Sequence, residues 1–251
     1  MHRLLVHASL LNEEHPELPP EAARHLRVLR PKPGEEFELF DGHGAVRSYV
    51  SAGGGLVAAS AVRTFVRPAQ SLTLFACLTK GSRWDWTVEK ATELGVTRIV
   101  PVVSERTIVR IPPAERAAKR ARWQRIAEEA ARQSDAKWLP EIGGAVDFRD
   151  VLQVVRTTTC FIGALTVPPS PPIAAAVRAA LDGARNPGDD LHLAAFIGPE
   201  GDLTPAELAA LTAIARPTSF GPTVLRAETA AIFAVSVLSA AIGAGCRPIS
   251  R

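Results

Sequence analysis

The chain has 251 residues, enough for one large domain or two unequal domains with a substantial buried core. Hydrophobic residues make up 47% of it and charged residues 22%, a composition that is ordinary for a globular protein and excludes extensive disorder. The net charge of +3 permits a polyanionic partner such as a nucleic acid, but it does not require one.

The segment 1–68 is predicted to be a small β-rich unit with one helix. Apolar residues recur at i, i+4 and i+7 within 20–29, which predicts an amphipathic helix with Arg24 and Arg27 on its solvent side. Strands are predicted at 37–41, 45–51 and 56–66, and a hairpin turn at 41–44 joins the first two. Residues 67–70 are expected to be a linker.

Short apolar runs alternate with helical patterns from residue 71 onward. This alternation predicts a parallel sheet that is covered on both faces. Thr204-Pro205-Ala206-Glu207 is a capping box with proline at the first helical position, so a helix is expected to start there. Further helices are predicted at 84–94 and 113–133, and strands at 72–78, 98–103, 159–165, 192–197 and 217–220.

Three cysteines, Cys77, Cys160 and Cys246, lie far apart without a C-x-x-C pair, which argues against a zinc site or a disulfide framework. A reducing cytoplasm fits this usage. The first residues make a poor signal peptide, and the apolar segment 229–244 falls short of the roughly 20 residues that a membrane span needs. We therefore expect a cytoplasmic protein with no membrane contact, in which 229–244 is a helix buried in the domain or at a subunit interface. The histidines lack ligand spacing, so no metal is expected.

Two glycine-bearing segments, 197–202 and 219–229, follow the last two predicted strands. Glycine lets a ligand approach the backbone closely. Open α/β sheets bind ligands at the carboxyl ends of their strands, so we expect these two loops to follow neighbouring strands and to form a ligand crevice. The dinucleotide, P-loop, zinc-protease and nucleophile-elbow motifs do not occur.

Basic residues surround the helix predicted at 113–133, apart from a core-facing row that includes Trp123. A solvated face and a phosphate-contacting patch both account for these charges. All four tryptophans lie between 84 and 138, where core packing and base stacking are both open. The basic residues are Arg116, Lys119, Arg120, Arg122, Arg125 and Arg132.

Several motifs, taken in order and spacing, resemble the 16S ribosomal RNA uracil-N3 methyltransferases of RsmE type, within the SPOUT class. The resemblance covers nearly the whole chain. It rests on Arg24-His25-Leu26-Arg27-Val28-Leu29-Arg30, Phe40-Asp41-Gly42, Lys80-Gly81, Glu89-Lys90-Ala91-Thr92-Glu93-Leu94-Gly95-Val96, Ser104-Glu105-Arg106, Arg122-Trp123, 128–134, 140–142, Gly198-Pro199-Glu200-Gly201 and Leu225-Arg226-Ala227-Glu228-Thr229-Ala230.

The chain departs from the family pattern at two positions. A second glycine is usual where Asp202 stands, and an arginine is usual where Thr223 stands. Aspartate enters the left-handed region more readily than most residues, so Asp202 is the better tolerated change if the glycine is needed for its backbone angles. Because Thr223 stands where the family has an arginine, the positive charge usual in that loop is not assigned to a residue here.

The resemblance implies a PUA-like RNA-binding β-barrel domain over residues 1–68 and a SPOUT α/β methyltransferase domain over residues 71–251. The second domain would carry a C-terminal trefoil knot, an arrangement that sequence periodicity alone would not suggest. It implies a homodimer that binds S-adenosylmethionine in the knot and methylates 16S rRNA of the small ribosomal subunit. The implied cofactor-binding residues are Leu165, Gly198, Pro199, Glu200, Gly201, Phe220, Val224, Leu225 and Thr229.

Uracil N3 must lose its proton before it can be methylated, and negative charge then spreads over the flanking carbonyl oxygens. Arg226 is our candidate for stabilising that charge, with Glu228 orienting it or serving as the base. An Arg226–Glu228 pair that only holds the fold is the alternative. Because N3 lies on the Watson–Crick edge, the target uridine must be unpaired or flipped. We expect Arg24, Arg27 and Arg30 to grip RNA phosphates.

Three functions therefore compete: the uracil-N3 methyltransferase, another SPOUT RNA methyltransferase that modifies ribose 2′-OH or a tRNA guanine, and a non-catalytic RNA-binding factor of ribosome assembly.

Overall fold

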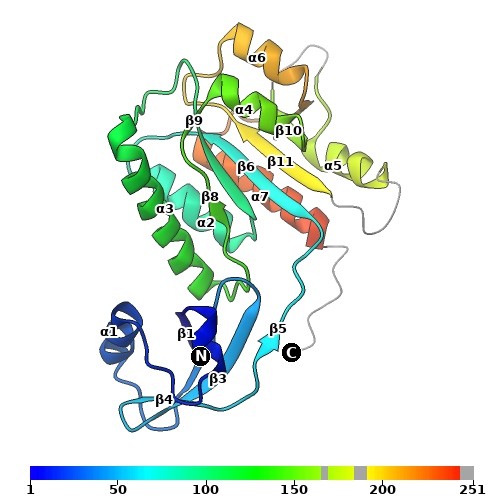
Figure 1. The fold of residues 1–251 in the computed structure, drawn as a ribbon. Coiled ribbons are helices and arrows are strands. Elements are labelled where there is room, and N and C mark those ends of the chain that lie inside the picture. Colours follow the sequence, from blue (N-terminus) through cyan, green and yellow to red (C-terminus); the bar gives the residue numbers. More distant parts are fainter. Residues whose placement is uncertain (165–168, 184–190, 244–251) are drawn as a thin grey trace. The chain divides into compact units, whose positions relative to one another are not determined.

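The computed structural model describes residues 1–164, 169–183 and 191–243 (Figure 1). The chain divides into two compact units. The first unit comprises Met1–Arg67 together with Glu128–Leu139, and the second comprises the rest of the chain. Helix α3 (Pro113–Gln133) therefore contributes residues to both units.

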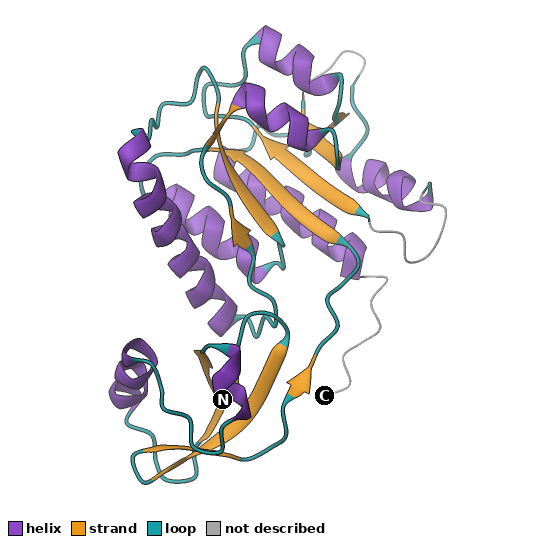
Figure 2. Ribbon diagram, in the orientation of Figure 1, coloured by secondary structure: helices purple, strands orange, loops and turns teal. Residues whose placement is uncertain are grey.

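The first unit is built on a five-stranded sheet in the order β1-β2-β3-β4, with β5 also paired to β3 (Figure 2). The predicted hairpin is confirmed, because β2 and β3 pair antiparallel around the turn at 41–44. The β1–β2 pairing is parallel, and the remaining pairings are antiparallel. The strands are β1 (His2–Leu5), β2 (Glu36–Phe40), β3 (Ala45–Ala52), β4 (Gly55–Ala58) and β5 (Arg63–Thr64).

The long strand predicted at 56–66 is wrong, because the structure has two short strands there, β4 and β5. Side-chain hydrogen bonds to Ser60 interrupt the ladder between them. The Arg47 guanidinium donates to the Ser60 carbonyl oxygen over 2.7 Å, and the Ser48 amide donates to the Ser60 hydroxyl over 3.1 Å. The chain therefore leaves the sheet at this point and re-enters it at β5.

Helix α1 (Pro20–Leu29) is confirmed with the predicted bounds, and Ala22 and Leu26 are its buried residues. A short 3₁₀ turn (Ala8–Asn12) precedes it. The end of α3 is held in this unit by buried Arg3, whose guanidinium donates to the carbonyl oxygens of Ala131 (2.8 Å) and Ala136 (3.1 Å).

The second unit contains a parallel sheet in the order β12-β10-β11-β6-β7-β8, with β9 also paired to β7. Among the described residues, every strand pairing in this sheet is parallel, as predicted. The expectation that the last two strands are neighbours is wrong, because β10 lies between β11 and β12. The strands are β6 (Ser71–Cys77), β7 (Arg98–Val103), β8 (Glu141–Ile142), β9 (Val146–Asp147), β10 (Thr159–Gly163), β11 (His192–Ile197) and β12 (Arg216–Thr218).

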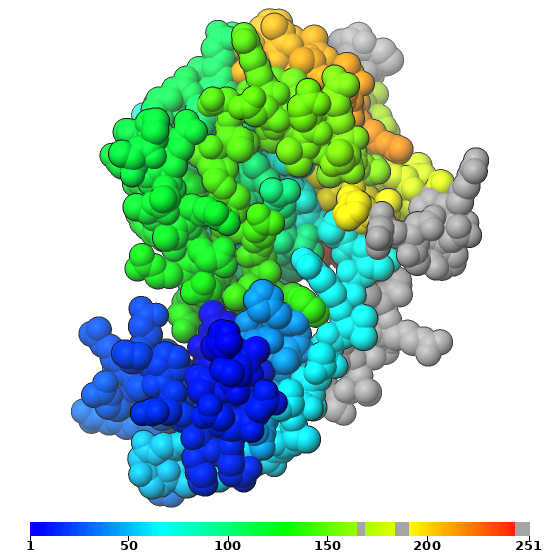
Figure 3. All heavy atoms as spheres, in the orientation of Figure 1, coloured from blue at the N-terminus to red at the C-terminus, as the bar shows by residue number. Residues whose placement is uncertain are grey.

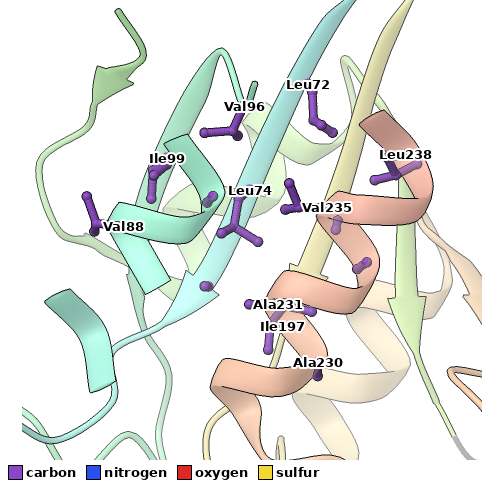
Figure 4. Close-up of a cluster of buried hydrophobic side chains, with 14 of the residues drawn as sticks. Leu72, Leu74, Val88, Val96, Ile99, Ile197, Ala230, Ala231, Val235 and Leu238 are labelled. Carbon is purple, nitrogen blue, oxygen red and sulfur yellow. The ribbon is translucent and has the colours of Figure 1, made fainter. Parts of the chain in front are cut away.

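Helices cover both faces of this sheet and create two separate cores. One core joins α2 (Ser82–Glu93), α3, α5 (Ile173–Asp182) and α7 (Ala227–Gly243) to the sheet. The other joins α4 (Phe148–Val155) and α6 (Pro205–Thr212) to the opposite face. Buried alanine and valine side chains of α7 face Leu72 and Leu74 of β6, so this apolar helix is buried as predicted (Figure 4). None of the helices in the described ranges is long and apolar enough to cross a membrane.

Candidate functional site

The two glycine-bearing loops come together at the carboxyl edge of the parallel sheet. Ile197, the last residue of β11, lies beside Ala230 and Ala231 at the start of α7 (Figure 4). The loop after β11 therefore begins close to the point where the 219–229 segment ends. The predicted convergence of the two loops is confirmed, although their strands are not adjacent.

Arg83, in the first turn of α2, ties these loops together. Its guanidinium forms an ion pair with Glu200 of the loop after β11, and its Nε lies 3.8 Å from Oε1 of Glu228 in the first turn of α7. The Glu228 side chain is only 14% exposed, and its buried Oε2 has no hydrogen-bond partner among the described residues. One carboxylate oxygen of Glu228 thus faces a cation while the other is free to accept a hydrogen bond.

The loop after β7 holds the other side of the 198–201 loop. The Arg106 guanidinium donates to the Gly201 carbonyl oxygen over 3.2 Å, and the Glu105 amide donates to a Glu207 carboxylate oxygen over 2.9 Å. Glu207 also completes the capping box with Thr204, which confirms the predicted start of α6. The loop after β7 therefore holds the end of the glycine loop at Gly201 and the start of α6 at Glu207.

Asp202 follows this loop with a φ of 57°, in the left-handed region. Glycine and, less readily, aspartate adopt such angles, so the backbone conformation explains how Asp202 is accommodated where the family pattern has glycine. The conditional expectation from the sequence is confirmed at this position.

Phe220 is placed by contacts with β10. Ser219 leaves the β12 ladder to exchange backbone hydrogen bonds with Pro171 and Ile173, which ends β12 earlier than predicted. A Cβ at Gly163 would lie 2.8 Å from the Phe220 ring, so only glycine permits this approach. The ring is also 5.8 Å from that of Phe233.

The other predicted cofactor residues differ in exposure. Gly198 and Leu225 are half-buried and Pro199 is buried, whereas Gly201, Thr229 and Val224 are exposed. Val224 is 89% exposed, so it forms no apolar wall in this arrangement. Leu165 lies outside the described residues.

The predicted catalytic pair is separated in the structure. Arg226 is exposed and forms no ion pair with any described residue, while Glu228 lies beside Arg83 instead. The sequence analysis missed Arg83. The sequence signal that could have indicated Arg83 is its position in the first turn of the helix that follows β6, because that helix starts at the same edge of the sheet as the two loops.

A second candidate surface lies on α1 in the first unit, whose side chains stand on the molecular surface (Figure 3). Arg24, Arg27, Val28 and Arg30 line a hollow of about 620 Å³. Arg30 ends the helix with a φ of 48°, so the chain turns there and brings this arginine to the same hollow. The three predicted RNA-binding residues are therefore brought together.

Structural partners are found for several of the basic residues predicted on α3. Arg120 donates to the Ile142 carbonyl oxygen, Arg122 pairs with Asp85, and Arg132 pairs with Glu129. Trp84 and Trp123 are buried with their rings 5.5 Å apart, which favours core packing for these two tryptophans. Within the described parts of the chain, no cluster of three or more potential metal ligands occurs.

Comparison with known proteins identifies the family. Residues 67–239 match the family described as RNA methyltransferase domain, and residues 18–50 match the RNA methyltransferase PUA domain. A ribosomal RNA small subunit methyltransferase E from Synechocystis is 32% identical over 219 residues, which span 85% of this chain and 69% of that protein. This chain belongs to the ribosomal RNA small subunit methyltransferase E family. The resemblance inferred from the sequence is confirmed.

Two further relatives support the assignment to the methyltransferase E family. The Bacillus subtilis member is 33% identical over 164 residues, which cover 64% of this chain and 62% of the Bacillus protein. The crystal structure of the Neisseria gonorrhoeae member bound to S-adenosyl methionine superposes with a TM-score of 0.76 at 27% identity, over 96% of this chain and 97% of that one.

Proposed function

We propose that this chain transfers the methyl group of S-adenosylmethionine to N3 of a specific uridine in 16S rRNA of the small ribosomal subunit. The observation that carries the proposal is the convergence of the 198–201 loop and the first turn of α7 on Arg83, in a member of the methyltransferase E family. This edge of an open parallel sheet is where such folds bind ligands.

The residues at this edge fit the methyl donor. S-adenosylmethionine supplies a methyl group on a positively charged sulfur, together with an adenine ring and a ribose. Backbone groups of Gly198 and Gly201 would read the adenine edge without side-chain interference, and Phe220 and Leu225 would offer apolar surface. The buried, unpartnered Oε2 of Glu228 is a polar atom that needs a partner which a ligand or substrate can supply.

Arg226 and Glu228 are the proposed catalytic residues. Because the Arg226 guanidinium is exposed and has no carboxylate partner among the described residues, it is available to face the negative charge on the uracil carbonyl oxygens. Glu228 has one oxygen free, so it can accept the N3 proton or hold the base. Its ion pair with Arg83 makes a role in orienting Arg226 the weaker alternative.

RNA binding is assigned to Arg24, Arg27 and Arg30 of the first unit. These three arginines line one hollow, and the exposed Val28 adds apolar surface to it. Clustered arginines bind phosphates through charge and paired hydrogen bonds. The target uridine must be flipped or unpaired to expose N3.

The trefoil knot and the homodimer are also proposed. β12 stands at the outer edge of the sheet, whereas α7 packs against β11 and β6 further in. Between β12 and α7, the backbone of Ser219 forms hydrogen bonds with residues 171 and 173, which is consistent with a chain threaded past the segment after β10.

Phe233 of α7 is 38% exposed and fits a subunit interface in a cytoplasmic dimer. An experimental trace of the whole chain tests the knot, and sedimentation velocity tests the dimer.

The proposed function is tested in two measurements. Calorimetry of the purified protein with S-adenosylmethionine should show binding, and absence of binding would favour a non-catalytic RNA-binding factor. Nucleoside mass spectrometry of small-subunit rRNA from a deletion strain should show loss of N3-methyluridine. Unchanged N3-methyluridine would overturn the proposal and favour another RNA methyltransferase.

Arg226→Ala should lower the rate of methyl transfer about 100-fold while changing donor affinity little, because the guanidinium acts on charge that develops during the reaction. Equal loss of rate and affinity would instead assign Arg226 to donor binding.

Arg24→Ala combined with Arg27→Ala should weaken RNA binding and reduce the slope of log affinity against log salt by about 2, one for each lost phosphate contact. Arg149→Ala with Arg156→Ala removes two exposed arginines at α4 and serves as the matched control. An unaltered slope in the α1 variant would remove these residues from the RNA interface.

A further inference from the structure

The ion network at the sheet edge contains a residue to which neither the sequence motifs nor the family comparison gives a role. Arg83 is the only described cation that the structure pairs with both Glu200 and Glu228. Glu200 lies in the loop after β11 and Glu228 in the first turn of α7, and the two carboxylates would repel one another at close range without a cation between them. A guanidinium can serve both, since it presents five donors in a fixed plane.

We propose that Arg83 is a positioning residue for methyl transfer, which holds the Glu228 carboxylate and the 198–201 loop in their working arrangement. The inference rests on the proposed function and deepens it. Arg83 acts through Glu228, whose Oε1 it faces and whose Oε2 it leaves free. An ion pair at one oxygen favours one orientation of the carboxylate, so the free oxygen faces a preferred direction.

The helix that carries Arg83 is a rigid support. Trp84, the next residue, is buried and contacts the Trp123 ring, and Val88 lies one turn further in the core. Functional groups on packed helices are held more accurately than groups on loops. α2 also packs directly against α7, which bears Glu228, so the two helix starts have a fixed spacing.

A purely stabilising role accounts poorly for this arrangement. The Arg83 side chain is 45% exposed, and exposed ion pairs contribute little to folding. Glu228, by contrast, is mostly buried with one oxygen unpartnered, which is unfavourable for stability alone. Loss of Arg83 should therefore affect the geometry of the site much more than the fold.

The test compares Arg83→Ala and Arg83→Lys with Arg98→Ala, using small-subunit RNA as substrate. Arg98 is the matched control because it is similarly exposed and pairs with Glu141, but it lies at the start of β7, at the opposite edge of the sheet from the two loops. Arg83→Ala should lower kcat about 10- to 100-fold, the effect expected when a reacting group is misplaced. The KM for the RNA and the temperature of thermal unfolding should change little. Arg83→Lys should recover part of kcat, and Arg98→Ala should stay near the wild-type value.

Combining Arg83→Ala with Glu228→Gln distinguishes positioning from an independent effect. If Arg83 acts through Glu228, the double variant should be no slower than Glu228→Gln alone. Additive losses, an unchanged kcat in Arg83→Ala, or an equal loss in Arg98→Ala would each overturn the inference. A wild-type protein that binds S-adenosylmethionine but methylates no RNA would overturn the proposed function itself, and the role of Arg83 with it.

Discussion

Glu38 shows how strongly a single buried charge can matter in the first unit. Its side chain is 1% exposed and lies within 3.2 Å of nitrogens of Arg3, Lys137 and Arg63. Glu38→Ala would leave the buried Arg3 guanidinium without its carboxylate, so we expect a loss of about 3–5 kcal/mol in unfolding free energy. Chemical denaturation measures this loss.

Glu14→Ala is the control for that experiment. Glu14 pairs with Arg47 over 3.5 Å, but its side chain is 66% exposed, so its removal should change stability by no more than about 0.5 kcal/mol. Similar effects of the two substitutions would show that the Glu38 cluster contributes no more than a surface pair.

Cys77 is the titratable residue whose environment makes the clearest prediction. Burial raises the pKa of its thiol from about 9 to about 11, partly opposed by hydrogen bonds from Ser104 and Thr107. At pH 8 the folded protein should therefore resist alkylation at Cys77, whereas the unfolded chain should react. Peptide mass spectrometry after iodoacetamide treatment checks this, and rapid labelling of the native protein would contradict it.

The same shift links Cys77 to stability at high pH. Below about pH 9 the thiol is neutral in both states and contributes no pH dependence. As the pH rises from about 9 to 11, the unfolded chain loses this proton more readily than the folded one, so the contribution of Cys77 should reduce stability.

At the scale of elements, the start of α6 depends on a local signal that the sequence displays. The Thr204 hydroxyl accepts a hydrogen bond from the Glu207 amide, and the Glu207 carboxylate accepts one from the Thr204 amide. Thr204→Ala should cost about 1 kcal/mol of unfolding free energy. Thr212→Ala, at the other end of the same helix, should cost less because Thr212 only bonds back to carbonyls of its own helix. Equal costs would argue against the cap.

Such local signals explain why several elements were predicted with their observed bounds. α1, α3, β7 and β11 are each delimited by periodicity, proline or glycine close in the chain. β4 and β5 were predicted as one strand because the bonds from Arg47 and Ser48 to Ser60 join residues 12 or 13 positions apart. Periodicity within a segment carries no information about such partners.

At the scale of the whole molecule, residues 128–139 belong to the first unit although they are flanked by the second in sequence. Arg3 and Glu38 hold this segment through the carbonyl oxygens of Ala131 and Ala136 and the ammonium group of Lys137. A truncated chain of residues 68–251 should therefore show fast amide exchange at 128–139. Exchange at α2 in the same protein is the internal control, and unchanged protection of 128–139 would contradict the prediction.

The sequence by itself determined the alternation of elements, the parallel sheet, the two glycine loops and, through the order of its motifs, the methyltransferase family. These features depend on neighbours in the chain or on recognisable residue patterns. Only the tertiary structure decided that β10 separates β11 from β12, that Arg83 rather than Arg226 faces Glu228, and that 128–139 joins the first unit. Each of these contacts joins residues far apart in the chain, so it is set by how whole elements pack rather than by any local pattern.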